Sequence, residues 1–200
     1  MLAADLQNRI MNYIRAHSGF ETKRTYVGMS HLSECPADQF TTFRDGLPET
    51  DYNHRMAYLG YALETVEKAI LVNAGVLRSI GREIVAEFDS RIRGHIDGET
   101  VDGDLVEIKT VSTVRFERIL ESGKALRDHF TQVQAYMHFG GYRHAEIIYV
   151  CRDDFRHHVV HVAYQPGVGE QIEAKARHVL AAIDEGRQPP CECRRSDASK

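Results

Sequence analysis

Apolar side chains near the start of the chain recur at helical spacing. Leu6, Ile10, Tyr13 and Ile14 fall on one face of a helix, which predicts an amphipathic helix over residues 4–17. Residues 19–53 mix Gly, Pro, Thr and Asp with few periodic apolar positions. This composition predicts loops, with one short helix over residues 37–43.

The longest apolar stripe steps by three and four residues, and its members are Met56, Leu59, Leu63, Val66 and Ile70. The stripe predicts a helix over residues 54–73 whose apolar side is buried. Asn73 and Gly75 suit its carboxyl end, because both residue types tolerate the left-handed conformation that ends many helices.

Shorter stretches with partial alternation predict strands in two groups. The expected strands are residues 82–88, 92–97 and 105–111, and then 145–151 and 156–164. Helical patterns separate and follow the two groups, over residues 113–122, 126–139 and 168–185. Three strands, then helices, then further strands predict an α/β fold with a mixed central sheet flanked by helices.

Composition narrows the class of protein. The chain has 200 residues, of which 42% are hydrophobic, so it is long enough for one domain with a buried core. The ordinary apolar content and the nearly balanced charge exclude a disordered tail, and the formal net charge of −4 excludes a basic protein that binds nucleic acid by bulk charge. No apolar run approaches 18 residues, and the first ten residues lack the apolar stretch of a signal peptide. We therefore expect a cytoplasmic protein without a membrane partner.

The candidate chemistry lies on two of the predicted strands. Side chains alternate along a strand, so Glu107 and Lys109 share a face while Ile108 points to the other side. Asp97 ends the preceding strand, one hairpin away. Two neighbouring carboxylates suit a hard divalent cation such as Mg²⁺ or Mn²⁺, and a lysine beside them suits phosphodiester hydrolysis. The alternative is a solvated strand face with a cross-strand ion pair.

The helices on either side of these strands offer further polar side chains. Glu64 lies next to Leu63 of the apolar stripe, where a carboxylate can reach the sheet and add a metal ligand. Gln132 and Tyr136 are four residues apart and share a helical face. The alternatives are an ordinary exposed glutamate and a generic amphipathic helix.

At this point the chain resembles the PD-(D/E)XK nuclease superfamily, and within it the RecB-like exonuclease branch. That branch has a Gly-x-x-x-(His/Glu) helix, then Gly-x-x-Asp, (Asp/Glu)-x-Lys and Gln-x-x-x-Tyr. Here the motifs are Gly60 with Glu64, Gly94 with Asp97, Glu107 with Lys109, and Gln132 with Tyr136. Each motif alone is weak, but four in order are fairly specific. The resemblance implies a restriction-endonuclease-like αβββαβ core.

The resemblance also implies roles. Asp97 would bridge the metal or metals, and Glu107 with the Ile108 carbonyl would complete the coordination. Lys109 would orient the nucleophile, and Glu64 would stand in for the more usual histidine. Gln132 and Tyr136 would position Lys109 and the DNA. Residues 1–200 would then form a single nuclease domain, with an N-terminal extension (1–53), a catalytic core (54–164) and a C-terminal helix with a basic tail (165–200).

The cysteines depart from the family pattern. Many RecB-like exonucleases hold an iron-sulfur cluster with one cysteine near the N-terminus and three near the C-terminus. Cys35 matches the first, but only Cys191 and Cys193 stand near the end. Cys151 ends a predicted core strand, where a buried apolar role is expected. A zinc site with Cys35, Cys191, Cys193 and a nearby histidine, or three free thiols, are the alternatives to a cluster.

DNA contacts are expected from local rather than total charge. Four basic residues follow the metal motif, namely Arg115, Arg118, Lys124 and Arg127, and Arg194, Arg195 and Lys200 form a basic tail. Glu117 and Glu121 interleave with the first group, so a solvated helical face is its alternative. The resemblance favours an exonuclease that acts on DNA ends in recombination, repair, or phage or CRISPR DNA processing, alone, self-associated or with a helicase. An endonuclease of the restriction or junction type, a non-catalytic binding module, and a small metal-binding protein are the competing hypotheses.

Overall fold

The computed structural model describes residues 3–193, and the basic tail expected at Arg194, Arg195 and Lys200 lies outside that range. The α-helices are α1 (Ala3–His17), α2 (Pro36–Asp45), α3 (Asp51–Asn73), α4 (Thr113–Ser122), α5 (Arg127–Gly140) and α6 (Pro166–Glu185), with a 3₁₀ turn η1 (Met29–His31). The strands are β1 (Val27–Gly28), β2 (Leu77–Val85), β3 (Ile92–Thr100), β4 (Leu105–Val111), β5 (His144–Cys151) and β6 (His157–Ala163).

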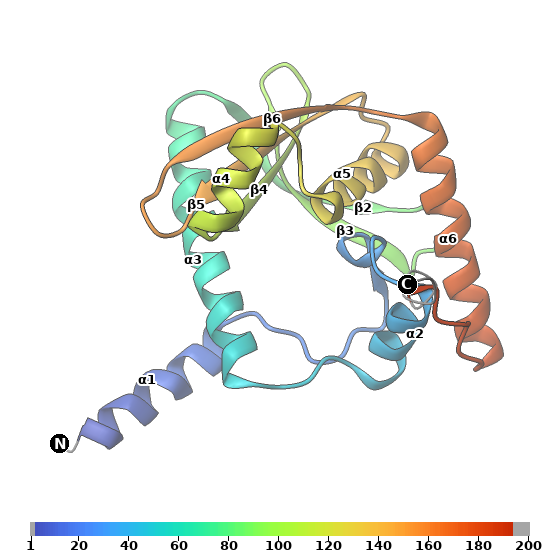
Figure 1. The fold of residues 1–200 in the computed structure, drawn as a ribbon, viewed down its shortest axis with the longest axis horizontal. Coiled ribbons are helices and arrows are strands. Elements are labelled where there is room, and N and C mark those ends of the chain that lie inside the picture. The colour runs from blue at the N-terminus through green and yellow to red at the C-terminus, as the bar shows by residue number, and fades with distance from the viewer. Residues whose placement is uncertain (1–2, 194–200) are drawn as a thin grey trace, which may run out of the picture.

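The strands form one mixed sheet in the order β1-β3-β4-β5-β6, and β2 pairs antiparallel with β3 from Leu77–Thr100 to Val85–Arg93. A hairpin joins β3 to the antiparallel β4, whereas β4 and β5 are parallel from Leu105–Ala145 to Val111–Cys151. Parallel neighbours need a long crossover, and α4 and α5 supply it. The expected fold class, a mixed sheet flanked by helices, is confirmed (Figure 1).

The two faces of the sheet bury different cores. On β4, Leu105 and Val111 belong to the larger cluster, which packs against α4, α5 and α6. Val106 and Ile108 face the other way, into a small cluster that contains Leu71 of α3. This is the alternation expected of a strand covered on both sides. It places α3 on one face of the sheet and α5 on the other.

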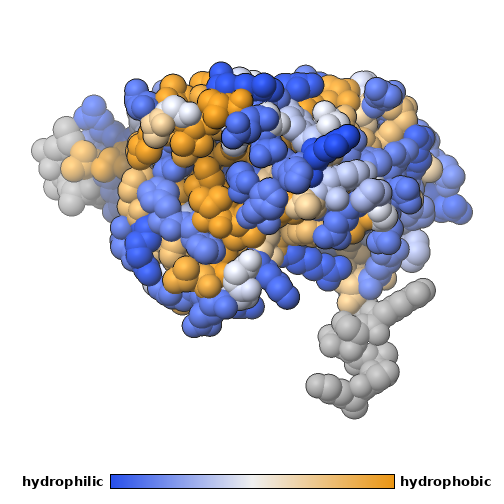
Figure 2. Space-filling view, turned by 90° about the horizontal axis from the view of Figure 1, so that it is seen from above, coloured by the Kyte–Doolittle hydropathy of each residue, from blue (hydrophilic) through white to orange (hydrophobic). Residues whose placement is uncertain are grey.

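Three of the five residues in the stripe expected to be the buried side of α3 face solvent instead, while Met56 and Leu63 are half-buried. Leu59, Val66 and Ile70 are 37%, 49% and 42% exposed. The buried residues of the helix include Glu67, whose carboxylate lies 2.9 Å from His157 Nε2 on β6. The expectation of a wholly apolar buried side was wrong, since that side includes a glutamate that pairs with β6. Figure 2 shows apolar surface gathered on the side of the molecule where α3 lies.

Other boundaries differ in detail. The second-group strands and the helices lie close to the predicted ranges, and Gly141 (φ 75°) and Gly186 (φ 64°) end α5 and α6 in the left-handed conformation. Strand β2 begins at Leu77 rather than at residue 82, and β1 and η1 were not predicted. Helix α1 projects away from the body, joined to α3 by an ion pair between Arg15 and Asp51 (Figure 1). The division into one nuclease domain with two extensions stays a prediction.

Within residues 3–193, none of the helices combines the length and the apolar character that crossing a bilayer requires.

Candidate active site

The site lies where β3 and β4 part. Their pairing covers only Gly98–Val106 and Glu99–Leu105. One residue further, the Asp97 carboxylate accepts a hydrogen bond from the Ile108 amide at 2.7 Å. A side-chain oxygen thus takes the place of a backbone carbonyl, which satisfies the amide while the strands separate. This contact fixes Asp97 beside the Glu107–Lys109 segment, as the sequence motif predicted.

Glu107 is buried, with 3% of its surface exposed. Its Oε1 lies 2.6 Å from Lys109 Nζ and accepts a hydrogen bond from Gln132 Nε2 at 2.7 Å. Its Oε2 is buried without a hydrogen-bond partner. Burial raises the pKa of Glu107 to about 7, although the Lys109 charge opposes the shift. A buried oxygen without a donor is an unusual feature, and it is consistent with a ligand site.

Lys109 keeps its charge in this setting. Burial alone would lower the pKa of the ammonium, but the attraction of Glu107 and the further charges of Asp97 and Glu64 outweigh it and raise the pKa. Lys109 is therefore a cation held against the candidate reaction centre. The predicted convergence of Asp97, Glu107 and Lys109 is present in the structure.

Helix α5 supplies the two residues of the fourth motif. Gln132 Nε2 lies within hydrogen-bond distance of both Glu107 Oε1 and the Tyr136 hydroxyl, the latter at 3.2 Å. Burial raises the pKa of Tyr136, so the phenol stays neutral. Tyr136 packs over Gly94, where a Cβ would lie 2.7 Å from the ring carbon Cε1. The glycine of the second motif is thus a point of close approach between β3 and Tyr136.

Helix α3 supplies Glu64 and a residue that the sequence analysis missed, Lys68. Lys68 Nζ lies 2.5 Å from Glu64 Oε1 and 3.2 Å from Asp97 Oδ1. Burial raises the pKa of Glu64, and the nearby Asp97 charge adds to the effect. Lys68 is one helical turn after Glu64, and this i,i+4 spacing was the signal that could have found it.

Three carboxylates and two ammonium groups therefore share the site. Oxygen ligands of this kind suit a hard divalent cation, and the unpartnered Oε2 of Glu107 offers one directly. In the described part of the chain, however, only a group of cysteines brings three potential ligand atoms within 4.8 Å of one another. The donor set fits a divalent cation, and in this structure the two lysines pair with its carboxylates. The predicted use of the Ile108 carbonyl stays a prediction.

The expected DNA-contacting residues do not form one group. Arg115 and Arg118 are exposed on α4, and Lys124 is exposed in the loop that follows. Arg115 is near enough to the site for its charge to lower the pKa of His129, after burial and Lys109. Arg127 instead lines an open hollow of about 620 Å³ beside Cys35 and Lys175.

The three cysteines expected to act together are brought together. The Sγ atoms of Cys35 and Cys191 are 3.9 Å apart, and those of Cys35, Cys191 and Cys193 all lie within 4.8 Å. Burial would raise the pKa of the Cys35 thiol, but hydrogen bonds from the amides of Glu192 and Ala37 outweigh it and lower the pKa to about 7. Cys151 is buried in the main core and contacts Thr113, so a four-cysteine cluster does not fit this chain.

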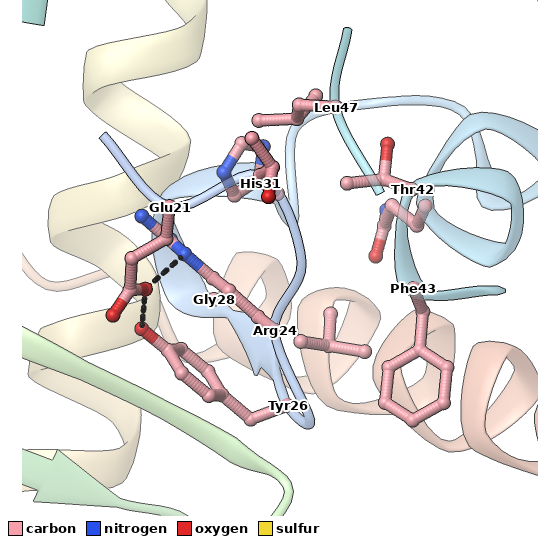
Figure 3. A pocket seen from close by; sticks show the side chains of 11 residues that line it. Glu21, Arg24, Tyr26, Gly28, His31, Thr42, Phe43 and Leu47 are labelled. Atoms are coloured by element: carbon pink, nitrogen blue, oxygen red, sulfur yellow. Dashed lines mark hydrogen bonds and ion pairs between the residues drawn. The ribbon is translucent and has the colours of Figure 1, made fainter. Parts of the chain in front are cut away.

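A small cavity lies apart from these groups, between residues 21–31 and α2 (Figure 3). Its volume of about 20 Å³ matches roughly one water molecule. Arg24 and Tyr26 both reach Glu21 on its rim, and the buried Gln39 contributes an Oε1 without a hydrogen-bond partner. The cavity is too small for a nucleotide and none of the motif residues lines it.

The chain has the α/β fold found in exonuclease structures. The alkaline exonuclease LHK-Exo from Laribacter hongkongensis aligns with a TM-score of 0.64 and 16% identity, covering 88% of this chain and 93% of its own. LHK-Exo in complex with dAMP aligns at 0.65 and 16%, covering 80% and 89%. SSO0001 aligns at 0.54 and 15%, covering 88% and 86%. No protein-family profile and no curated sequence matches the chain. At such identities the likeness establishes a shared fold.

Proposed function

We propose that this protein is a divalent-metal-dependent deoxyribonuclease that hydrolyses phosphodiester bonds from DNA ends. The observation that carries the proposal is the meeting of Asp97, Glu107 and Lys109 where β3 and β4 part. Asp97, Glu107, Glu64 and the Ile108 carbonyl would hold Mg²⁺ or Mn²⁺. When bound there, the cation would lower the pKa of a water molecule and neutralise charge on the phosphate.

Other residues of the chain would stabilise charge, position Glu107 and contact the DNA. Lys109, a half-buried cation against Glu107, would stabilise negative charge that develops on the phosphate oxygens. Gln132 donates to Glu107 Oε1 and so fixes the carboxylate that Lys109 contacts. Tyr136, held neutral by burial, belongs to the main core and contacts Gln132 from that side. Arg115 and Arg118 would hold the DNA backbone outside.

Action on ends is favoured over internal cleavage by one observation. LHK-Exo, which shares the fold over most of both chains, is an exonuclease and was crystallised with dAMP. An endonuclease on the same fold is the second candidate. A binding module without activity is disfavoured because it has no physical need for a buried, unpartnered carboxylate oxygen at Glu107.

Degradation of end-labelled linear DNA beside a closed circle tests the proposal. The assay uses single- and double-stranded substrates with Mg²⁺, Mn²⁺ or EDTA, the variant Lys109→Met, and Lys23→Met as an exposed control. We expect linear DNA to be lost only with metal, in the parent protein and in Lys23→Met. Nicking of the circle would favour the endonuclease. Loss of linear DNA in EDTA or in Lys109→Met would contradict the proposed mechanism.

We further propose a cytoplasmic protein that works on DNA as a self-associated assembly or with a helicase. The support is physical, since one small domain offers limited surface on which to hold a DNA strand. A monomeric mass in solution, together with full activity of the purified chain, would contradict this part of the proposal.

The cysteine group carries a separate metal proposal. We propose that Cys35, Cys191 and Cys193 bind one thiophilic ion such as Zn²⁺, with a fourth ligand that is not a cysteine. Titration with Co²⁺ is expected to give thiolate charge-transfer absorption that is lost in Cys35→Ser and kept in Cys151→Ser. An absorption band at about 400 nm in anaerobically purified protein would instead show an iron-sulfur cluster.

A further inference from the structure

Lys68 occupies the carboxylate oxygens that a divalent cation would need. Its Nζ lies 2.5 Å from Glu64 Oε1 and 3.2 Å from Asp97 Oδ1. The second oxygen of Asp97 is already used, because it accepts the hydrogen bond from the Ile108 amide. Asp97 can therefore offer Oδ1 freely only if the ammonium group of Lys68 withdraws.

The Lys68 side chain is largely shielded from solvent where it meets the two carboxylates. Only 20% of its side chain and 14% of that of Asp97 are exposed. Among the residues that the structure describes, Lys68 is the one ion-pair partner of both Glu64 and Asp97. Lys109, the other cation of the site, is committed to Glu107. Lys109 thus pairs with Glu107 on β4, and Lys68 pairs with both Glu64 on α3 and Asp97 on β3.

We propose that Lys68 is a built-in counter-cation that competes with the divalent metal for Glu64 and Asp97. Without metal it holds the two carboxylates together. When metal binds, the ammonium group leaves them, which its four-carbon flexible stem permits while α3 stays in place. The inference rests on the proposed function and deepens it, because it makes metal affinity a balance between two cations at the same oxygens.

A positioning role of this kind predicts an effect opposite to that of a metal ligand. Removal of a ligand weakens metal binding, whereas removal of a competitor strengthens it. A charge retained on a longer side chain would preserve the competition. Lys68→Met and Lys68→Arg therefore separate the two roles, since Met keeps the unbranched stem without the charge.

Mn²⁺ binding by calorimetry tests the inference, with the parent protein, Lys68→Met, Lys68→Arg and the exposed control Lys23→Met. We expect Lys68→Met to bind Mn²⁺ about tenfold more tightly, which corresponds to about 1.4 kcal/mol. Lys68→Arg and Lys23→Met should stay near the parent value. In EDTA, Lys68→Met should melt at a lower temperature than the parent, because Glu64 and Asp97 then repel each other, and Mn²⁺ should raise its melting temperature by more.

The outcomes separate the inference from the proposed function. If the parent binds Mn²⁺, Asp97→Asn abolishes that binding, and Lys68→Met binds no more tightly than the parent, the competition is refuted while the nuclease proposal stands. If neither the parent nor Lys68→Met binds Mn²⁺, both fail. If Lys68→Met binds more weakly with an unchanged circular dichroism spectrum, Lys68 supports the metal site and does not compete for it.

Discussion

Asp97 accepts a hydrogen bond from the backbone amide of Ile108 at 2.7 Å, just beyond the last paired residues of their two strands. One carboxylate oxygen thereby closes the gap in the sheet, and the other points toward Lys68. One oxygen of Asp97 therefore serves the fold, and the other is available for the proposed metal site. A substitution that keeps the first and removes the second should separate folding from function.

Asp97→Asn makes that separation. The amide oxygen can still accept from Ile108, while the amide nitrogen replaces the oxygen that faces Lys68. We expect the melting temperature to stay within a few degrees of the parent value. DNA cleavage should fall by more than about a hundredfold, since loss of a ligand should cost more than loss of a residue that only orients one. Parent-like cleavage by Asp97→Asn would remove Asp97 from the mechanism.

The two motif glycines should respond differently to alanine. At Gly94 a Cβ would lie 2.7 Å from Tyr136 Cε1 and 3.2 Å from Met29 Cβ, so Gly94→Ala must displace the tyrosine or the strand. Overpacking of this kind costs about 1–3 kcal/mol. We expect Gly94→Ala to lower the free energy of unfolding, measured in urea, by that amount and to reduce cleavage.

Gly60→Ala is the matched control. Gly60 lies inside α3, and a Cβ there would meet nothing within 4 Å. Alanine is the better helix former by about 0.8–1.0 kcal/mol, so this variant should be as stable as the parent or more stable. Equal destabilisation by the two substitutions would show that Tyr136 does not need the close approach at Gly94.

The contrast between these glycines shows what the sequence could and could not predict. Alternation along β4 correctly placed Glu107 and Lys109 on one face, and the hairpin brought Asp97 to them. These are local consequences of strand geometry, so a spacing rule captures them. The motif pattern, however, gives no reason for either glycine. At Gly94 the reason is the close approach of Tyr136. At Gly60 a Cβ would meet no atom within 4 Å, so the structure gives no reason for the glycine there.

Helix α3 shows the limit more clearly. Its apolar stripe predicted a buried side at Leu59 and Val66, yet the buried side contains Glu67 and the site-facing side contains Lys68. Periodicity assumes that the surface beneath a helix is apolar. Here that surface includes His157 and Asp97, which are far away in the sequence. The side of α3 that faces the sheet thus carries charged residues with partners on other elements, and the spacing of apolar residues could not reveal them.

DNA binding by α4 should appear in the salt dependence. Arg115 and Arg118 are exposed and form no ion pair among the described residues. If each contacts one phosphate, then Arg115→Gln and Arg118→Gln should each reduce the slope of log K against log salt by about 0.9 on duplex DNA, or about 0.7 on single strands. Arg187→Gln, on a side chain that is 83% exposed and paired with Glu185, should leave the slope unchanged. Unchanged slopes in all three variants would place the DNA elsewhere.

His129 should make the protein less stable in mild acid. Its ring lies against Tyr149, with Nδ1 3.0 Å from the hydroxyl, and only 12% of the side chain is exposed. Burial lowers the pKa of His129 to about 4, and the Lys109 charge adds to the effect. An unfolded chain has a histidine pKa of about 6.5. Between these values the unfolded state binds a proton that the folded state does not, so stability falls as the pH falls.

The loss should reach about 3 kcal/mol once the pH is below 4, with a slope of at most about 1.4 kcal/mol per pH unit between 6.5 and 4. Urea unfolding at several pH values measures it, and His129→Gln should flatten the curve over that interval because glutamine does not titrate. NMR titration of the His129 ring gives the folded-state pKa directly. A value at or above 6.5 would mean that the folded protein admits the charged imidazole beside Lys109, and the acid sensitivity would then need another origin.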